Sequence, residues 1–187
     1  MTRAVFLDRD GTMLEEAGYL DRLERLAFFP YTVDAVRLLN HAGFAVVVVT
    51  NQAGIARGLF EESFVDEAHR HMTERFAAGG ARVDGYYYCP HHPDGAVARF
   101  RQRCECRKPL PGLVYQAAAD LSLDLAGSYM VGDRWHDLAA GQAAGTRGIL
   151  VRTGYGRSAE SAPQHGVVAA AVVDNLIQAV SWILRES

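Results

Sequence analysis

Lysine is almost absent from this 187-residue chain. Of its 19 basic residues, 18 are arginine, and Lys108 is the single lysine. Because arginine serves wherever the surface needs a cation, the one position that keeps a compact ammonium group invites a specific role. The formal net charge of −3 is also unlike the strong positive charge of a nucleic-acid-binding protein. We therefore expect no nucleic-acid partner, and local groups would have to bind an anionic ligand.

Long apolar runs are lacking as well. None approaches the ~20 residues that span a bilayer, and no basic-plus-apolar signal segment stands at the start of the sequence. These features predict a cytoplasmic protein with no membrane partner. With 49% hydrophobic residues, the chain can bury one sizeable core. We expect a single domain over residues 1–187, without a separate cap domain, and a monomer.

Cysteine is scarce, and its distribution is uneven. The chain has three cysteines, all between positions 89 and 106, and an odd number in a reducing compartment disfavours a disulfide framework. Two pairs of soft ligands stand twelve residues apart, namely Cys89 with His91 and Cys104 with Cys106. Three thiolates and one imidazole would close a tetrahedral zinc site of the structural kind. This predicts a zinc-pinned loop at about 89–108.

Two other interpretations of this loop stay open. His92 competes with His91 as the nitrogen ligand, although the spacing of His91 mirrors that of the Cys-x-Cys pair. Ordinary loop cysteines are the second alternative, which the clustering of all three makes less attractive.

Two aspartates end the first predicted strand. The apolar run at residues 4–7 is followed by Asp8-Arg9-Asp10-Gly11-Thr12. The carboxyl edge of a parallel sheet is where ligands bind, and a carboxylate there can attack phosphorus while a second carboxylate shuttles the proton. A solvated strand end or a helix cap is the alternative for a bare Asp-x-Asp.

Polar side chains also end two later strands. Thr50, Asn51 and Gln52 follow the apolar run at 44–49, and Asp133, Arg134 and Asp137 follow the run at 129–131. A hydroxyl and an amide can donate to phosphate oxygens, although such residues also cap helices. Asp133 can complete a Mg²⁺ site with Asp8 and the backbone carbonyl of Asp10, and Asp137 can support it.

The single lysine directly follows the second cysteine pair. Lys108 would neutralise phosphate charge beside the attacking aspartate, and Arg107 could make forked contacts with another anionic group of the substrate. A basic loop face that includes Arg99, Arg101 and Arg103 is the alternative, and it is the best argument for a nucleic-acid ligand.

The remaining sequence predicts alternating strands and helices. Strands are expected at 4–7, 44–49, 83–88, 129–131 and 148–151, and helices at 32–41, 62–77, 111–121 and 173–184. Two segments are expected to be irregular: 153–166, and a flap at 13–30 whose Glu16 and Tyr19 could touch substrate. His69 and His71, two residues apart on a helix, are expected to be solvated.

Together these motifs resemble the haloacid dehalogenase-like phosphohydrolase superfamily. Within it, the zinc loop before Arg107-Lys108-Pro109 resembles the subfamily that dephosphorylates a heptose bisphosphate. The resemblance implies an α/β fold with a doubly wound, mainly parallel, Rossmann-like sheet. It further implies Mg²⁺ and structural Zn²⁺ as cofactors and a phosphorylated sugar as the substrate.

The resemblance also implies roles for individual residues. Asp8 would be the nucleophile and Asp10 the acid/base, with Thr50, Asn51 and Lys108 on the transferring phosphoryl group. Asp8, Asp10 and Asp133 would bind Mg²⁺. The resemblance places Arg107 on the substrate, and four further residues are expected to contact substrate: Glu16, Tyr19, Gln52 and Arg134. Arg134 departs from the lysine that is common there in the family.

Other functions remain as alternatives. The same chemistry would suit histidinol phosphate or a nucleic-acid 3'-phosphate, and the twelve-residue spacing between the cysteine pairs favours the heptose subfamily over the histidinol phosphatases. A non-catalytic, zinc-stabilised binding module is the more distant alternative.

Overall fold

The computed structural model describes residues 1–186. Within this range the chain forms one six-stranded sheet in the order β3-β2-β1-β4-β5-β6, and every neighbouring pair is parallel. The strands are β1 (Thr2–Leu7), β2 (Ala45–Asn51), β3 (Gly85–Cys89), β4 (Leu123–Gly132), β5 (Arg147–Val151) and β6 (Ala171–Val173). The predicted doubly wound α/β fold is confirmed.

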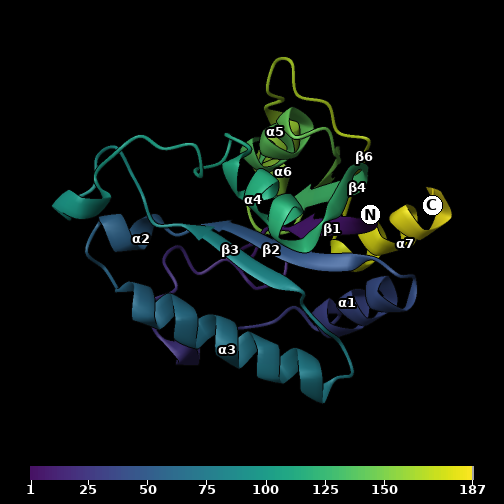
Figure 1. Cartoon of the computed structure of the whole chain (residues 1–187), viewed down its shortest axis with the longest axis horizontal. Coiled ribbons are helices and arrows are strands. Elements are labelled where there is room, and N and C mark those ends of the chain that lie inside the picture. The colour runs from purple at the N-terminus through teal and green to yellow at the C-terminus, as the bar shows by residue number, and fades with distance from the viewer. Residues whose placement is uncertain (187) are drawn as a thin grey trace.

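Helices cover both faces of the sheet. In Figure 1, α1, α3 and α7 lie on one side, and α4 and α5 lie on the other. The helices are α1 (Thr32–His41), α2 (Ala53–Ala56), α3 (Glu62–Ala78), α4 (Gly112–Leu121), α5 (Trp135–Ala143), α6 (Gly156–Ser161) and α7 (Leu176–Glu186). Among the residues that the structure describes, no helix is long and apolar enough to cross a membrane.

The central strands are buried on both faces because their residues alternate between two cores. In β2, Val46 and Val48 join the core beneath α1, α3 and α7, whereas Val47 and Val49 pack toward α4. All four side chains are fully buried. A continuous run of β-branched residues is therefore what this position in the sheet requires.

The predicted elements form, α5 follows β4, and three further elements were not expected. A short helix, α2, follows β2; α6 lies within the segment expected to be irregular; and β6 precedes the last helix, which begins at Leu176 rather than at 173. The prediction for 153–166 was therefore wrong for α6. Glycines flank this helix in the sequence, but tertiary contacts hold it: the Trp135 indole donates to the Ala159 carbonyl at 2.6 Å, and Arg152 pairs with Glu160 at 2.7 Å.

The chain reverses direction across the sheet between β1 and β4. Asp8 directly follows β1, Thr50 lies near the end of β2, and Asp133 directly follows β4. Ligands of open α/β sheets bind at such a switch point, outside the carboxyl ends of the strands. The fold thus brings the three predicted motifs to one edge.

Candidate active site

A cavity of about 300 Å³ opens at this edge of the sheet. Its lining contains almost every residue predicted from the sequence for substrate or phosphate: Asp8, Asp10, Glu16, Tyr19, Thr50, Asn51, Gln52, Arg107, Lys108, Arg134 and Asp137. Asp133 is absent from the lining and is completely buried. The tertiary structure therefore gathers the predicted set around one cavity.

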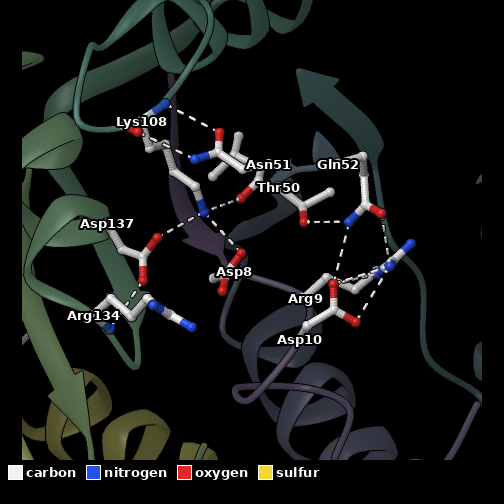
Figure 2. Close-up of polar contacts among 10 residues, drawn as sticks. Asp8, Arg9, Asp10, Thr50, Asn51, Gln52, Lys108, Arg134 and Asp137 are labelled. Atoms are coloured by element: carbon white, nitrogen blue, oxygen red, sulfur yellow. Dashed lines mark hydrogen bonds and ion pairs between the residues drawn. The ribbon is translucent and has the colours of Figure 1, made fainter. Parts of the chain in front are cut away.

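Lys108 lies at the centre of the cluster. Its ammonium group is 2.7 Å from Asp8 Oδ1 and 2.7 Å from Asp137 Oδ1 (Figure 2). It also donates to the carbonyl of Val49 at 2.7 Å. The side chain is 2% exposed. A buried cation with two carboxylate partners is held in one place, beside the carboxylate that would attack phosphorus.

Asn51 fixes the backbone of the same lysine. Its amide nitrogen donates to the Lys108 carbonyl at 3.1 Å, and its amide oxygen accepts from the Lys108 N–H at 3.1 Å. This two-way bridge occupies both polar ends of the side chain. The amide expected to contact phosphate thus binds the Lys108 backbone, and its contact with phosphate stays a prediction.

Asp137 supports the site from the start of α5. Its Oδ2 accepts from the backbone N–H of Arg134 at 3.0 Å, and its Oδ1 faces Lys108. The same carboxylate therefore caps the start of α5 and forms an ion pair with the Lys108 ammonium group. This is the supporting position predicted for it.

Three carboxylates share this buried space. Oxygens of Asp8, Asp133 and Asp137 lie within 4.8 Å of one another, and Lys108 pairs with Asp8 and Asp137. Burial, opposed by Lys108 and reinforced by the charge of Asp137, raises the pKa of Asp8 to about 7. Burial together with the charges of Asp8 and Asp137 raises the pKa of Asp133 to about 8.

A divalent cation fits this cluster. Asp133 Oδ2 accepts from the Tyr155 N–H at 2.7 Å, but its buried Oδ1 has no hydrogen-bond partner among residues 1–186. A buried carboxylate oxygen without a partner is costly, and hard cations such as Mg²⁺ prefer oxygen ligands of this kind. Bound between Asp8 and Asp133, the cation would favour the ionised form of both.

Gly11 permits the close approach of two strand ends. A Cβ atom on this residue would lie 2.3 Å from Asp133 Oδ2, and its φ of +81° is one that side-chain-bearing residues rarely adopt. The glycine of the first motif is therefore required by the position of Asp133.

Gln52 joins the first two motifs. Its amide nitrogen donates to Thr50 Oγ1 at 2.9 Å and to Asp10 Oδ2 at 3.2 Å, and its oxygen accepts from Arg9 at 3.1 Å. The side chain was expected to bind substrate, but its polar atoms are used within the protein. Because Thr50 accepts a bond from Gln52, its own hydroxyl proton stays available to donate toward the cavity.

The predicted flap reaches the cavity with both expected residues. Glu16 Oε1 accepts from the Gly18 N–H at 2.6 Å, and burial raises the pKa of Glu16. Arg57 lies 5.9 Å from the ring centroid of Tyr19. Arg25 donates to the carbonyls of Ala17 and Tyr19 at 2.6 and 3.0 Å, so the flap has a defined shape.

Two arginines supply positive charge to the cavity wall. The Arg107 guanidinium donates to the carbonyl of His91 at 3.3 Å, which ties it to the cysteine-rich loop. The Arg134 guanidinium lies 3.5 Å from the ring centroid of Tyr155. Both cations line the cavity, whereas Lys108 is the cation that pairs with Asp8.

The four predicted zinc ligands converge. Cys106 Sγ lies 3.0 Å from Cys89 Sγ, 3.3 Å from Cys104 Sγ and 3.3 Å from His91 Nδ1. His92 points elsewhere, with Nε2 3.4 Å from Arg57. Three thiols and one imidazole nitrogen within 4.8 Å of one another fit a closed tetrahedral Zn²⁺ site. The structure therefore favours His91 over His92.

One helical histidine lies in the interior. His69 is 7% exposed, and its ring stacks on Tyr86 with a centroid separation of 4.6 Å. The prediction that it is solvated was wrong, whereas His71 is exposed as predicted. The helix turns the 69 position toward Arg9 and the tyrosines of β3, a contact that the spacing of two histidines could not reveal.

Sequence reasoning missed several residues of the site. Phe60 and Tyr155, neither of which was predicted, line the cavity, and His136 lines it too. Tyr155 follows β5, so the end of that strand was a signal for it. Phe60 lies in a loop with no such signal. Arg9 also escaped notice, although it is a charged residue between two aspartates.

Several known proteins are similar to this chain in sequence. A family model described as HAD-hydrolase-like matches residues 105–179. D-glycero-beta-D-manno-heptose-1,7-bisphosphate 7-phosphatase of Yersinia pestis is 50% identical over 159 residues, which are 84% of each chain. The enzyme of the same name from Escherichia coli K12 is 49% identical over 153 residues, covering 81% of this chain and 80% of the relative.

A solved structure agrees over the whole length. D,D-heptose 1,7-bisphosphate phosphatase from B. bronchiseptica, in complex with magnesium and phosphate, superposes with a TM-score of 0.87 at 34% identity and covers 99% of both chains. The chain therefore belongs to the haloacid dehalogenase-like family of hydrolases. Within that family, it is similar to the phosphatases named for heptose 1,7-bisphosphate.

Proposed function

We propose that this chain is a Mg²⁺-dependent phosphomonoesterase that removes the 7-phosphate of D-glycero-β-D-manno-heptose 1,7-bisphosphate. The observation that carries the chemistry is the buried pair of Asp8 and Lys108 beside the unpartnered oxygen of Asp133. The shared name of relatives about half identical to this chain supports the substrate. A cytoplasmic location, a single domain, a monomeric state and the absence of a nucleic-acid ligand stay predictions.

Asp8 acts as the nucleophile in this proposal. One of its carboxylate oxygens attacks phosphorus, the bond from phosphorus to the sugar oxygen breaks, and the carboxylic acid of Asp10 gives its proton to that oxygen. Water then attacks the aspartyl-phosphate, ionised Asp10 takes a proton from the water, and phosphate leaves with Asp8 restored. Thr50 and Lys108 donate to the phosphoryl oxygens.

The metals have separate places. Asp8, Asp133 and the backbone carbonyl of Asp10 would hold Mg²⁺, which screens the repulsion between carboxylate and phosphate. Zn²⁺ would lie among the three cysteines and His91. The ligand nearest to Lys108 along the chain, Cys106, stands two residues before it. Its role is structural, because four protein ligands leave no open position for water.

Two arginines would bind the second phosphate of the substrate. Arg107 and Arg134 line the cavity, and a guanidinium group matches a phosphate with two parallel hydrogen bonds. The cavity of about 300 Å³ is at the lower end of the range for small-molecule sites. Two cations on the wall suit a bisphosphate better than histidinol phosphate, whose amine is itself a cation.

A substrate panel tests the proposal. The kcat/KM should be highest for the β-anomer of the bisphosphate with Mg²⁺ present, and lower by at least about 100-fold for histidinol phosphate and a nucleic-acid 3'-phosphate. Asp8→Asn should abolish turnover while the fold and bound zinc persist. Equal kcat/KM for histidinol phosphate would overturn the substrate, and substantial turnover by Asp8→Asn would overturn the mechanism.

A further inference from the structure

Arg9 is a charged residue that has no contact with the cavity. It stands between the two aspartates of the first motif, yet it is 1% exposed and does not line the cavity. Its guanidinium group turns to Asp10, with Nε 3.1 Å from Oδ2 and Nη2 3.2 Å from Oδ1 (Figure 2). This is a forked contact with both oxygens of the proposed acid/base.

The position of the guanidinium group is itself determined by two other elements. Gln52, just after β2, accepts from Nη2 at 3.1 Å, and His69 on α3 places Nε2 3.5 Å from Nη1. Arginine has only donors, so His69 must present an unprotonated nitrogen. Burial, together with the charge of Arg9, lowers the pKa of His69 to about 3, in keeping with a neutral ring.

The His69 ring cannot turn freely. It stacks on Tyr86 at an interplanar angle of 20° and meets Tyr88 edge-on, with ring centroids 6.0 Å apart. The backbone carbonyl of His69 accepts from Thr73 Oγ1 at 2.9 Å. The helix and β3 thus form a rigid support behind the guanidinium group.

Gln52 completes the arrangement around Asp10. Asp10 Oδ2 accepts from Arg9 and also from the Gln52 amide, at 3.2 Å, and the same amide donates to Thr50. The carboxyl group of Asp10 is therefore oriented by side chains whose own positions are fixed by β2 and α3. Alternative roles for Arg9 fit less well, because a phosphate-binding arginine would have to reach the cavity.

We propose that Arg9 is a positioning residue that sets the orientation of the Asp10 carboxyl group for proton transfer, with Gln52 and His69 holding its guanidinium group. This inference rests on the proposed function, since it assumes that Asp10 is the acid/base. A misplaced acid slows departure of a poor leaving group such as a sugar oxygen. A substrate with an activated phenolate leaving group needs no proton transfer for its departure. Its kcat/KM should therefore fall only slightly in the same variant.

A double-mutant cycle tests the proposal. Arg9→Lys keeps the charge but loses the fork, and it is measured in the native background and in Asp10→Asn. With the heptose bisphosphate as substrate, Arg9→Lys should lower kcat/KM by about 30- to 100-fold in the native background. In the Asp10→Asn background the further loss should be less than about 3-fold, because the group on which Arg9 acts is gone.

Leaving-group dependence supplies the second readout. Arg9→Lys should lower kcat/KM for 4-nitrophenyl phosphate by less than about 5-fold. His69→Phe keeps the ring beside Tyr86 but removes the accepting nitrogen, so it should show the same selectivity with a smaller loss. Arg70→Lys, exposed on the same helix, is the control and should change neither value by more than about 2-fold.

The outcomes separate this inference from the proposed function. Equal losses from Arg9→Lys in both backgrounds, or equal losses for both substrates, would overturn the positioning role. If Arg9→Lys does not fold, His69→Phe decides: a loss confined to the sugar phosphate supports the inference, and a substrate-independent loss overturns it. Full activity of Asp10→Asn would instead overturn the assignment of Asp10, and with it the proposed mechanism.

Discussion

Lys108 Nζ lies 2.7 Å from Asp8 Oδ1, so the single lysine of the sequence and the proposed nucleophile form a buried ion pair. The pair is not isolated, because Asp137 and the Val49 carbonyl share the same ammonium group. A cation in this place opposes the effect of burial on the ionisation of Asp8. Activity and stability should therefore depend on the same residue.

Replacing this lysine should damage both properties. Lys108→Met leaves Asp8 and Asp137 without their cation, and breaking a buried pair from one side costs roughly 3–5 kcal/mol. Activity should fall by at least about 100-fold, because Lys108 would stabilise the charge that develops on the phosphoryl group in the transition state. Urea unfolding and steady-state kinetics measure the two effects. Lys108→Arg, which keeps the charge, should recover part of the stability; retention of more than a tenth of the activity by Lys108→Met would contradict the role.

Asn51 gives a test of positioning against direct binding. Asn51→Ala removes both hydrogen bonds to the Lys108 backbone and should cost about 1–3 kcal/mol of stability. The kcat should fall because Lys108 is less well placed, while the inhibition constant of inorganic phosphate should change by less than about 3-fold. A tenfold rise in that constant would instead show that Asn51 itself contacts phosphate. Asn40→Ala is the matched control, because Asn40 is a half-buried asparagine that bridges α1 to the backbone of Arg82 away from the cavity.

The zinc assignment separates two neighbouring histidines. We expect one Zn²⁺ per chain in freshly purified protein, since three thiols and the His91 imidazole converge. His91→Ala should lose zinc, lower the melting temperature and reduce activity, because Lys108 directly follows this loop. His92→Ala should keep the metal, since His92 faces Arg57. Elemental analysis and thermal melting measure these effects. Loss of zinc from His92→Ala but not from His91→Ala would reverse the assignment.

Buried His69 predicts a pH dependence of stability. Its pKa is lowered to about 3 in the folded protein, from an ordinary value of 6.5. Between these values the unfolded chain binds more protons, so this contribution to stability is complete above pH 6.5 and is lost as the pH falls. The difference between native protein and His69→Phe should therefore shrink with acid, by up to about 1.4 kcal/mol per pH unit.

Urea unfolding from pH 7 to pH 4 at a fixed Mg²⁺ concentration measures this difference. His71→Phe is the control, because His71 lies on the same helix but is exposed, and its curve should run parallel to that of the native protein. A His69→Phe curve parallel to the native one would contradict the prediction, because it would show that the buried ring takes up its proton over the same pH range as in the unfolded chain.

Much of this molecule follows from local sequence. Apolar runs predicted β1, β2, β4 and β5, and the polar residues after them predicted the edge at which the site lies. The spacing of the cysteines predicted the four residues that converge near Lys108. These features can be predicted from the sequence because strand burial and ligand pairing depend on a few neighbouring residues.

Other features arise from contacts between distant segments. Asn51 meets the backbone of Lys108 across 57 residues, and Arg9 meets His69 across 60. Each of these side chains has ordinary alternatives on a surface, so its residue type alone does not say which partner it will find. The same holds for α6, which tertiary contacts support between two glycine-bearing turns.

The sequence by itself therefore determined the chemistry, that is, carboxylates, one lysine and soft metal ligands at the ends of predicted strands and in one loop. Only the tertiary structure decided the division of work among them. It placed Asn51 behind Lys108, Gln52 between Thr50 and Asp10, and Arg9 out of reach of the cavity. The physical reason is that a buried polar group must find a hydrogen-bond partner, and which partner lies within reach is set by how the strands and helices pack.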